Sequence, residues 1–332
     1  MPYRLEATTP EAVASDWAAL WSRAPDATPF QHPAWLIPWW RHFDEGDLRL
    51  LALRDGEHLR ALLPLYVHRR GLLPLGIGTS DYLDALAEPG FAEPAMAAFL
   101  AHRHDGFDRA DWPQLRPASP LLSGKAPPGW RDATEPAEPC PVLALPARFD
   151  LLGERVSAKT LRDLRTARRR AAEAGASFEE ATAATLTGIL DALFHLHAAR
   201  WATRGEAGVL ADPRVEAWHR DAAPALLQAG LLRLFALRLD GRIVGVIHAL
   251  ADPPGRVRRT LYLYLQGFDP ALERLSPGLL LVGEAVERGI ADGFAAVDFL
   301  RGQERYKSFW GAANAPTFRR VLIPPEAACA RC

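Results

Sequence analysis

The sequence predicts an α/β protein with two tandem domains, each a mixed, mostly antiparallel sheet flanked by helices. The chain has 332 residues, more than the roughly 250–300 at which a single hydrophobic core usually stops growing. The order of patterns is also approximately the same in both halves: a strand, two helices, a hairpin, a strand, a helix and a strand. We place the domains at residues 1–146 and 147–332.

Local patterns define the elements of the first half. Thr8 or Thr9 caps the first expected helix, and Pro10 lies in its first turn. Two strands alternate across an Asp55-Gly56 turn, a pattern typical of a hairpin. In chain order, we expect a helix over 9–24, an aromatic helix over 33–43, hairpin strands within 48–67, an apolar segment over 71–86, a helix over 93–104 and a strand over 107–115. A proline-rich stretch over 117–146 then indicates the domain boundary.

The second half repeats this order. A second Asp-Gly turn, Asp240-Gly241, predicts another hairpin. The segment LERLSPG leads from a strand into a helix, so the exposed N–H groups of that helix start are available to a phosphate group. In chain order, we expect a strand over 177–182, helices over 185–204 and 213–228, three strands within 231–268, a helix after Ser276-Pro277-Gly278, and a strand within 295–311.

A strongly basic helix over 155–175 lies between the halves, with Ser157 as its cap and Gly175 as its stop. Its cations recur at spacings of three or four residues and form one stripe. The stripe consists of Arg155, Lys159, Arg162, Arg165 and Arg169. Such a stripe is either a solvated helix face or a contact for a phosphate-rich ligand, such as a cofactor tail or an RNA.

Composition narrows the possible functions. With 39 basic and 40 acidic residues, the net charge is −1, so no global charge points to DNA or a membrane surface. The three cysteines, Cys140, Cys329 and Cys332, have neither metal-ligand nor disulfide-framework spacing. The start of the chain lacks a signal-peptide pattern, and no apolar run reaches about 18 residues. We therefore expect a cytoplasmic protein in a reducing compartment, with no membrane span and no metal.

Common catalytic signatures are missing from the sequence. It contains no GxSxG elbow, Walker lysine loop, HExxH or paired CxxC motif, which argues against the common hydrolase, NTPase and zinc-site classes.

Several ordered segments resemble one acyltransferase group. They are KTLRDLRTARRRAAEAG, LHAARWATRGEAGVL, LRLDGRIVG, YLYLQGFDPALERLSPGLLL and VDFLRGQERYKSFWG, which together span about residues 159–311. These segments resemble the GNAT superfamily, and within it the tandem-domain, CelD-like proteins associated with cellulose biosynthesis. The Fem-type aminoacyltransferases are more distant relatives. Upstream, PFQHPAWLIPWW and LGIGTSDYLDAL resemble the leading domain of these proteins.

The resemblance implies two GNAT-like domains, of which the second holds acyl-CoA, with an acetyl or longer chain. It also implies direct acyl transfer, without a metal or covalent intermediate. The expected acceptor is an amine or sugar hydroxyl of a small molecule or saccharide, in polysaccharide or cell-envelope biosynthesis. The superfamily's pyrophosphate signature is Gln or Arg, two residues, Gly, one residue, then Gly or Ala, and the RLSPG form here departs from it. The corresponding positions are Arg274, Leu275, Ser276, Gly278 and Leu279. A simple capping role for Ser276 and a packing role for Gly278 remain open.

Attack on a thioester requires a base, hydrogen-bond donors and an acid. Asp298, Glu304, Tyr306 and Lys307 follow the cofactor turn and are our catalytic candidates. Asp298 either acts on the acceptor or satisfies backbone groups or Arg301. Glu304 and Lys307 either take part in catalysis or form an ion pair, and Tyr306 either protonates the thiolate or packs against Trp310.

Two further groups are candidates. His197 is a possible base, and Arg200 and Trp201 follow it on the same expected helix and are possible substrate contacts; a structural hydrogen bond is the alternative for the histidine. Asp81 and Tyr82, with Ser80 and Asp84, would line an acceptor pocket between the domains, or form a turn.

Two other functions stay open. Aminoacyl-tRNA would replace acyl-CoA if the protein worked like the Fem-type enzymes, with the basic helix as the RNA contact. A non-catalytic binding or scaffold protein would keep the fold without the cofactor turn. The oligomeric state is not predicted.

Overall fold

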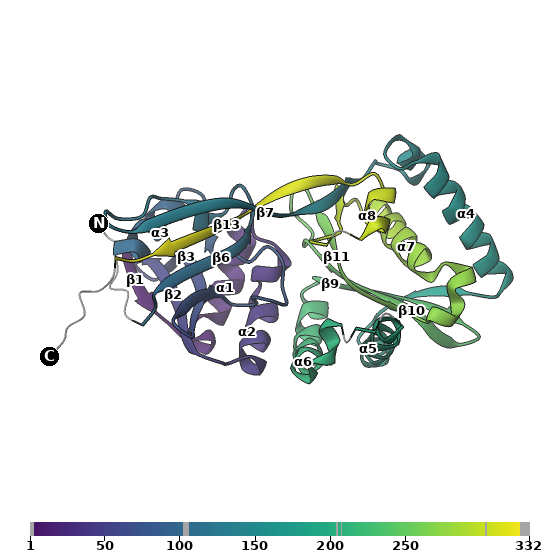
Figure 1. Cartoon of the computed structure of the whole chain (residues 1–332), viewed down its shortest axis with the longest axis horizontal. Helices are drawn as coiled ribbons and strands as arrows, with labels where there is room; N and C mark the ends of the chain where they lie inside the picture. The colour runs from purple at the N-terminus through teal and green to yellow at the C-terminus, as the bar shows by residue number, and fades with distance from the viewer. Residues whose placement is uncertain (1–2, 102–105, 204, 207, 303, 326–332) are drawn as a thin grey trace. The chain divides into compact units, whose positions relative to one another are not determined.

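A computed structural model describes residues 3–101, 106–203, 205–206, 208–302 and 304–325. The chain divides into two compact units, Met1–Glu138 with Pro316–Cys332, and Pro139–Ala315 (Figure 1). Our boundary at 146 and our single domain over 147–332 differ from this division. The difference arises because the last strand, β13 (Ala313–Ile323), returns to the first unit, where Phe318 pairs with Leu115.

Unit 1 contains the elements expected from its sequence, with small shifts of their ends. The Thr9 hydroxyl accepts a hydrogen bond from the Ala12 amide and so caps the first helix. The part of the third expected helix over 102–104 lies outside the described residues. The elements are β1 (Tyr3–Ala7), α1 (Pro10–Arg23), α2 (Pro33–His42), β2 (Asp47–Asp55), β3 (His58–His68), β4 (Gly71–Pro74), β5 (Leu86–Ala87), α3 (Ala92–Ala101) and β6 (Arg109–Leu115).

The sheet of unit 1 runs in the order β1-β2-β3-β4-β6-β13. The predicted hairpin is confirmed, because Asp55 pairs with His58 across the turn. β4 lies parallel to β6, whereas the other neighbours along this order are antiparallel. Buried side chains such as Phe99 and Trp112 fill the core on this sheet.

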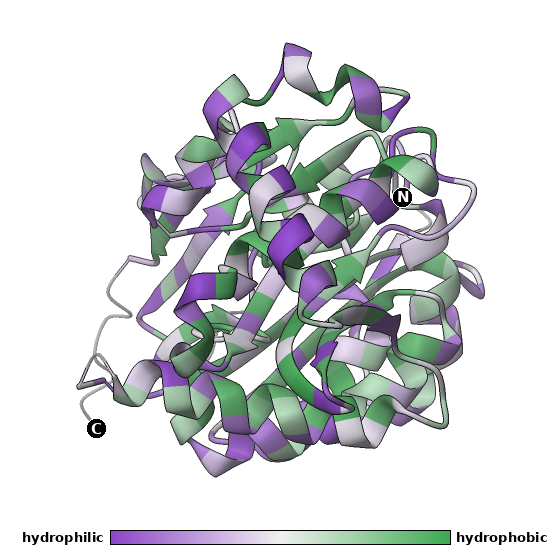
Figure 2. Ribbon diagram, turned by 90° about the vertical axis from the view of Figure 1, so that its right-hand side faces the viewer, coloured by the Kyte–Doolittle hydropathy of each residue, from purple (hydrophilic) through white to green (hydrophobic). Residues whose placement is uncertain are grey.

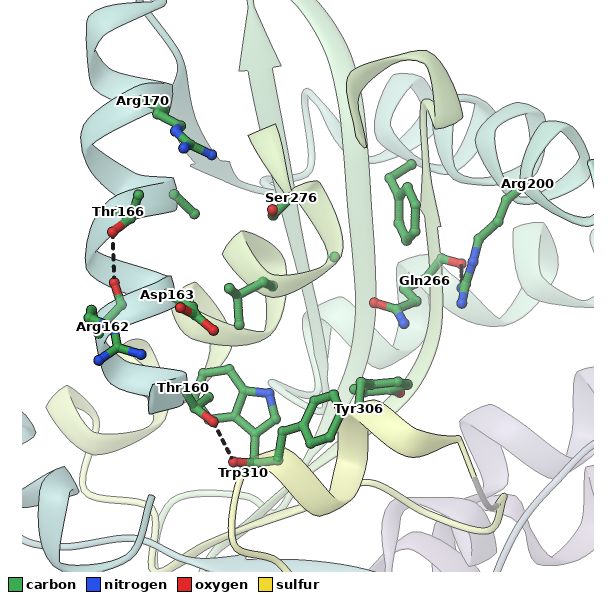
Figure 3. A pocket seen from close by; sticks show the side chains of 15 residues that line it. Thr160, Arg162, Asp163, Thr166, Arg170, Arg200, Gln266, Ser276, Tyr306 and Trp310 are labelled. Carbon is green, nitrogen blue, oxygen red and sulfur yellow. Dashed lines mark hydrogen bonds between the residues drawn. The ribbon is translucent and has the colours of Figure 1, made fainter. Parts of the chain in front are cut away.

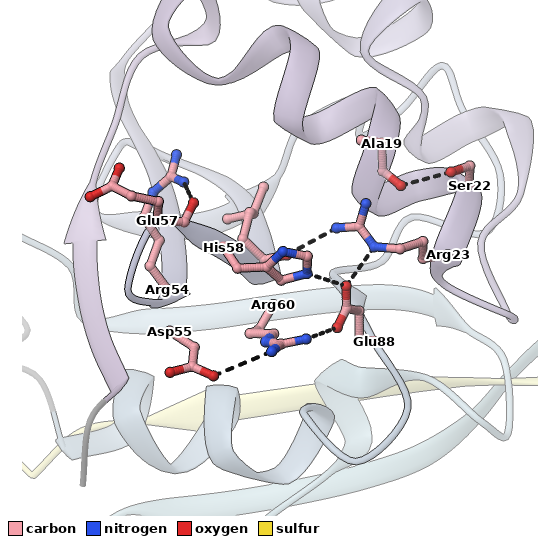
Figure 4. Close-up of polar contacts among 10 residues, drawn as sticks. Ala19, Ser22, Arg23, Arg54, Asp55, Glu57, His58, Arg60 and Glu88 are labelled. Atoms are coloured by element: carbon pink, nitrogen blue, oxygen red, sulfur yellow. Dashed lines mark hydrogen bonds and ion pairs between the residues drawn. The ribbon is translucent and has the colours of Figure 1, made fainter.

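An ion-pair cluster around Glu88 joins three parts of unit 1 (Figure 4). Its carboxylate accepts hydrogen bonds from Arg23 on α1 and from His58 and Arg60 on β3. Burial alone would raise the pKa of Glu88, but these hydrogen bonds outweigh it and lower the pKa to about 2. The carboxylate therefore stays charged at neutral pH and holds the helix to the sheet.

Unit 2 repeats the order of unit 1. The tail of the predicted helix at position 204 lies outside the described residues, and α6 has the predicted bounds. The elements are β7 (Arg131–Ala144), which begins in unit 1, α4 (Ala158–Glu173), β8 (Ser177–Glu180), α5 (Leu186–Ala202), α6 (Pro213–Gln228), β9 (Leu232–Leu239), β10 (Arg242–Ala251), β11 (Thr260–Phe268), α7 (Pro277–Ala291), β12 (Ala296–Asp298) and α8 (Arg305–Phe309).

The sheet of unit 2 runs in the order β7-β12-β11-β10-β9-β8. β11 and β12 are parallel, and their counterparts in unit 1 are β4 and β6, which are parallel as well. The expected duplication is thus confirmed: strand, two helices, hairpin, strand, helix, strand occurs in both units. Within unit 2, α5 and α6 cover one face of the sheet, and α4 and α7 lie on the other (Figure 1).

The basic helix α4 packs closely on α7. Ser157 Oγ accepts from the Thr160 amide and caps α4, as predicted, and Gly175 follows its end with φ +74°. A Cβ on Gly283 of α7 would lie 2.5 Å from Leu164 Cδ1, so glycine allows this close approach without a shift of the leucine. Leu164, Ala167 and Ala171 join the core of unit 2, and Figure 2 shows hydrophobic residues concentrated in the strands beneath more hydrophilic helix surfaces.

Three sequence expectations concern composition rather than elements. No helix in the described ranges is long and apolar enough to cross a membrane. Among the same residues, no group of histidine, cysteine and acidic side chains could hold a metal ion. Cys140 is a buried free thiol, whereas Cys329 and Cys332 lie outside the described residues.

Candidate active site

The strand β11 separates from β12 partway along its length, whereas it stays paired with β10 as far as Phe268. It pairs with β12 only through Thr260, Leu261 and Tyr262, and the last pair is Tyr262 with Asp298. Beyond this point β11 continues to Phe268 without β12 beside it. A β-bulge also interrupts its pairing with β10. The carboxyl-terminal half of β11 is therefore free of β12 and leads directly into the loop before α7.

The loop after β11 ends at a strained residue. Ser276 has φ +54° and ψ +54°, a left-handed backbone conformation that is uncommon for residues other than glycine. It occupies the cap position of α7, but its hydroxyl makes no capping bond, so the side-chain capping alternative is wrong. Pro277 begins the helix, as expected. Gly278 and Leu279 follow in the first turn, where backbone N–H groups have no acceptor within the helix.

A cavity of about 600 Å³ opens between α4, the end of β11, the start of α7 and α8. We call it the α4–α7 cavity (Figure 3). It is lined by Thr160, Arg162, Asp163, Thr166, Ala167, Arg170, Arg200, Gln266, Phe268, Ser276, Gly278, Leu279, Tyr306, Phe309 and Trp310.

The α4 wall of the cavity is cationic. Arg162 and Arg170 line it, and neither guanidinium has a hydrogen-bond or ion-pair partner among the residues that the structure describes. Asp163 is the acidic side chain on this wall. In Figure 3 Arg170 and Asp163 point from α4 toward Ser276, with Gln266 and Arg200 on the opposite side, and Arg162 lies at the edge, below Thr166. Two unneutralised guanidinium groups therefore share one cavity with the N-terminus of α7, which favours an anionic ligand.

The opposite wall comes from β11 and α5. The Arg200 guanidinium lies 4.8 Å from the centre of the Phe268 ring and its Nη1 donates to the Gln266 carbonyl at 3.5 Å. A Cβ on Gly278 would lie 3.1 Å from Phe268 Cε1. Glycine at 278 thus lets the helix start approach the aromatic wall closely, in agreement with its predicted packing role.

Tyr306 contributes a protonated phenol to the cavity. Its ring packs edge-on against Phe299, with 6.2 Å between ring centres. Burial, reinforced by the charge of Glu304, raises its pKa well above the usual range. The phenol therefore remains a hydrogen-bond donor at neutral pH.

The predicted stripe on α4 is divided between different surroundings. Arg162 faces the cavity, but Arg169 lies outside it, 3.7 Å from Glu173. The cavity face follows a different spacing of three or four residues, Thr160, Asp163, Ala167 and Arg170. Arg155, Lys159 and Arg165 are exposed and have no ion-pair partner among the described side chains.

The predicted donor-binding segment lies only partly on the cavity. Ser276, Gly278 and Leu279 line it. Arg274 and Leu275 belong to the preceding short helix, Pro270–Leu275, and are not among the lining residues.

Three predicted catalytic residues instead shape the loop after β12. Asp298 is buried, and its Oδ1 accepts from the Leu300 amide at 2.7 Å, which supports Leu300 at φ +56°. Lys307 is 3% exposed, and its amine donates to the carbonyls of Leu300 and Arg301. Glu304 Oε2 lies 2.9 Å from the same amine. None of the three lines the cavity, and the ion-pair alternative for Glu304 and Lys307 is confirmed.

His197 also points elsewhere than the predicted site. It is buried, and its Nε2 accepts from Trp201 Nε1 at 2.8 Å, so the structural alternative applies. Burial, with a contribution from Arg200, lowers the pKa of His197 to about 4. Among the predicted residues of α5, only Arg200 lines the cavity.

The predicted acceptor residues of unit 1 are buried in a turn that follows β4. Ser80 Oγ accepts from Trp35 Nε1, and the Tyr82 carbonyl accepts from Gln31. Asp84 accepts from the Ser119 hydroxyl at 2.7 Å. Asp81 is 4% exposed. The turn-forming alternative thus describes Ser80 and Asp81, whereas Asp84 also lines a separate cavity of about 180 Å³ in unit 1. An acceptor pocket at these residues stays a prediction.

Several cavity residues were not predicted as site residues. They are Thr160, Asp163, Thr166, Ala167, Arg170, Gln266, Phe268, Phe309 and Trp310. The position of Gln266 and Phe268 just before the LERLSPG loop is a usable signal for those two. The α4 residues could be found only by knowing which face of that helix turns toward α7.

Comparison with known proteins agrees with this geometry. Residues 158–308 match the family model described as an acetyltransferase (GNAT) domain. No protein in the curated set matches the sequence.

Solved structures share the fold over nearly the whole chain. FemX has a TM-score of 0.65 at 9% identity, with 96% of each chain covered. The C-terminal domain of a protein described as a lysylphosphatidylglycerol synthetase from Agrobacterium fabrum has a TM-score of 0.61 at 15% identity, covering 94% of this chain and 92% of that one. L-PGS from Bacillus licheniformis has a TM-score of 0.60 at 14% identity, covering 98% and 94%.

These comparisons leave the CelD-like relationship a prediction. The bulged strand that leaves its parallel neighbour and the family match lie in the same stretch of unit 2, and unit 1 repeats the order of its elements. Residues 158–308 are therefore a GNAT-fold domain, within an α/β chain made of two GNAT-like units.

Proposed function

We propose that unit 2 transfers an acyl group from acyl-CoA, with an acetyl or longer chain, directly to an amine or sugar hydroxyl. One observation carries this proposal: the first turn of α7 and the unpaired Arg162 and Arg170 share the α4–α7 cavity. A helix N-terminus and guanidinium forks are both suited to phosphate oxygens. Acyl-CoA is a thioester with a pyrophosphate in its tail, which suits these cationic groups. Its apolar portion can pack against the aromatic wall.

The residues present fit such a donor. The Gly278 backbone can approach a ligand because it has no side chain, and Arg162, Arg170 and Arg200 outnumber the carboxylate of Asp163 among the lining residues. The donor supplies an activated acyl group when bound. Tyr306 can donate a hydrogen bond to the departing sulfur because its phenol stays protonated. Lys307 and Asp298 hold the loop that leads into α8, the helix that carries Tyr306, which is an indirect role.

The test compares charge variants of α4 by calorimetric titration with acetyl-CoA. Arg162→Gln and Arg170→Gln should each weaken binding by about tenfold, since a charge-assisted hydrogen bond contributes about 1.5–3 kcal/mol. Arg169→Gln is the matched control, because it removes the same charge from the same helix outside the cavity. Equal effects of all three variants would contradict the proposal and indicate a general effect of net charge.

Aminoacyl-tRNA is the second candidate donor, as in Fem-type enzymes. Its support is that the exposed, unpaired Arg155, Lys159 and Arg165 extend the cationic surface of α4 beyond the cavity. Replacing these three residues with Gln should weaken binding of charged tRNA and reduce its salt dependence. No binding of charged tRNA at low salt would exclude this donor.

The setting of the reaction is also part of the proposal. The CelD-like resemblance favours a small-molecule or saccharide acceptor of polysaccharide or cell-envelope biosynthesis, with the enzyme in the cytoplasm and no DNA partner. Donor binding without turnover on any amine or sugar would instead favour the non-catalytic binding or scaffold function.

A further inference from the structure

A second group of polar aromatic side chains lies in unit 2, on the sheet face covered by α5 and α6. It consists of His219 on α6, His248 on β10 and Tyr264 on β11, whose ring centres are 5.4–5.6 Å apart. Trp218 stacks on His219 at 4.4 Å. His219 and His248 are 2% and 1% exposed, whereas Tyr264 is only half-buried. Tyr264 is therefore the accessible member of this histidine–tyrosine cluster.

Tyr264 occupies the bulge of β11. Ala249 pairs with Leu263 and His248 pairs with Leu265, so Tyr264 is the extra residue between them. The last pair between β11 and β12 ends two residues earlier, at Tyr262. Gln266, two residues later, lines the α4–α7 cavity. Along β11, Tyr264 therefore lies between the last residue paired with β12 and the cavity residue Gln266. Its ring contacts His219 of α6.

The cluster can hold a polar group without placing a charge beside it. Burial lowers the pKa of His248 to about 3, and burial, followed by the neighbouring His248 and His197, lowers the pKa of His219 well below its usual value. Each neutral imidazole has one N–H donor and one acceptor nitrogen, and a phenol hydroxyl both donates and accepts. These groups suit an acceptor N–H or O–H, which must be uncharged at the attacking atom.

We propose that Tyr264 positions the nucleophilic amine or hydroxyl of the acceptor, and that His219 and His248 act as positioning residues that fix the Tyr264 ring. This inference rests on the proposed acyl transfer and adds the acceptor side of the site. The acceptor nitrogen or oxygen bonds to the acyl carbon as the carbon–sulfur bond breaks. One proton leaves the acceptor and one is taken up by the sulfur, so Tyr264 ends with the proton it had.

The test measures thiol release from acetyl-CoA with D-glucosamine, which offers an amine and hydroxyls, and with hydroxylamine as a small nucleophile. Tyr264→Phe removes one hydroxyl. It should raise the KM for glucosamine about tenfold, the value of roughly one lost hydrogen bond, and leave calorimetric binding of acetyl-CoA unchanged. Tyr262→Phe is the matched control, two residues earlier on the same strand with its hydroxyl 3.4 Å from the Asp252 carboxylate.

The role of the two histidines is tested by combining a histidine variant with Tyr264→Phe. His248→Gln should also raise the KM for glucosamine, and the double variant with Tyr264→Phe should be no worse than Tyr264→Phe alone, because both act through one hydroxyl. A merely structural role would instead lower the Tm and weaken donor binding together.

Three results would overturn this inference. The first is an unchanged KM and kcat in Tyr264→Phe, and the second is an equal effect of Tyr262→Phe. The third is a wild-type protein that binds acetyl-CoA but releases no thiol with either nucleophile. Failure to bind acetyl-CoA at all is a different result, because it overturns the proposed function first.

Discussion

The Thr160 hydroxyl donates a hydrogen bond to the Phe309 carbonyl at 2.8 Å, although 149 positions separate the two residues. This bond ties the first turn of α4 to the last residue of α8. Both residues line the α4–α7 cavity. The basic helix is therefore a fixed wall of the site rather than a solvated linker between the two units.

Thr160→Val tests this connection. The variant should lose about 1 kcal/mol of unfolding free energy, the usual net value of one hydrogen bond, and should bind acetyl-CoA more weakly because its wall is less well fixed. Thr166→Val is the control: Thr166 also lines the cavity, but its hydroxyl donates to the Arg162 carbonyl within α4. Denaturant unfolding and calorimetry measure the two effects. Indistinguishable variants would show that the bond to Phe309 does not hold the wall.

Gly278→Leu should abolish donor binding while the protein stays folded. A side chain at this position meets the Phe268 ring at 3.1 Å or enters the α4–α7 cavity. Gly188→Leu on α5 is the control, because a Cβ there meets nothing within 4 Å. Acetyl-CoA titration and a thermal melt are needed for both. Full donor binding by Gly278→Leu would remove the start of α7 from the donor site.

Lys307→Met should destabilise the fold far more than Glu304→Gln. The methionine leaves the buried carbonyls of Leu300 and Arg301 without their donor, at a cost of about 1–3 kcal/mol. The Glu304 side chain is 48% exposed, so losing its charge should change the unfolding free energy by about 1 kcal/mol or less. Urea unfolding ranks the two. A fully stable but inactive Lys307→Met would instead assign the lysine to catalysis.

The unfolding free energy should fall as the pH is lowered from 7 to 5. Burial holds the pKa of His197 at about 4 and that of His248 at about 3, below the value of about 6.5 in an unfolded chain. The unfolded chain therefore binds more protons in this window, and stability present above pH 6.5 is lost on acidification. His248→Gln should flatten the pH dependence of urea unfolding, whereas His195→Gln, on the exposed side of α5, should not. If the unfolding free energy depended on pH to the same extent in both variants, the buried His248 would not be the cause of the pH dependence.

Patterns local to the chain predicted most of the fold. α6 begins and ends where its proline and apolar spacing indicate, and Ser157 caps α4 as expected. β7 was missed because Pro136, Pro139 and Pro141 read as a linker. Its place in the sheet comes from pairing with β12, where Val142 lies opposite Asp298. A contact across so many residues leaves no local signal.

The site was predicted less completely than the fold. The turn at Ser276 and Gly278 could be read from the order strand, loop and helix. The stripe on α4 could not be assigned, because three- or four-residue spacing fits several helix faces and only packing on α7 selects the one with Arg170. Lys307 resembled a catalytic residue in sequence because its carbonyl partners are backbone atoms, which carry no sequence signature.

We propose above all that the α4–α7 cavity binds acyl-CoA, the thioester donor of the acyl group. Calorimetric titration of the whole protein with acetyl-CoA and a longer acyl-CoA, with free adenosine as the control, tests it most directly. We expect saturable binding of a thioester, weakened in Arg170→Gln but not in Arg169→Gln, and no comparable binding of adenosine. Absence of binding by either thioester, or equal binding by the wild type and Arg170→Gln, would contradict the claim.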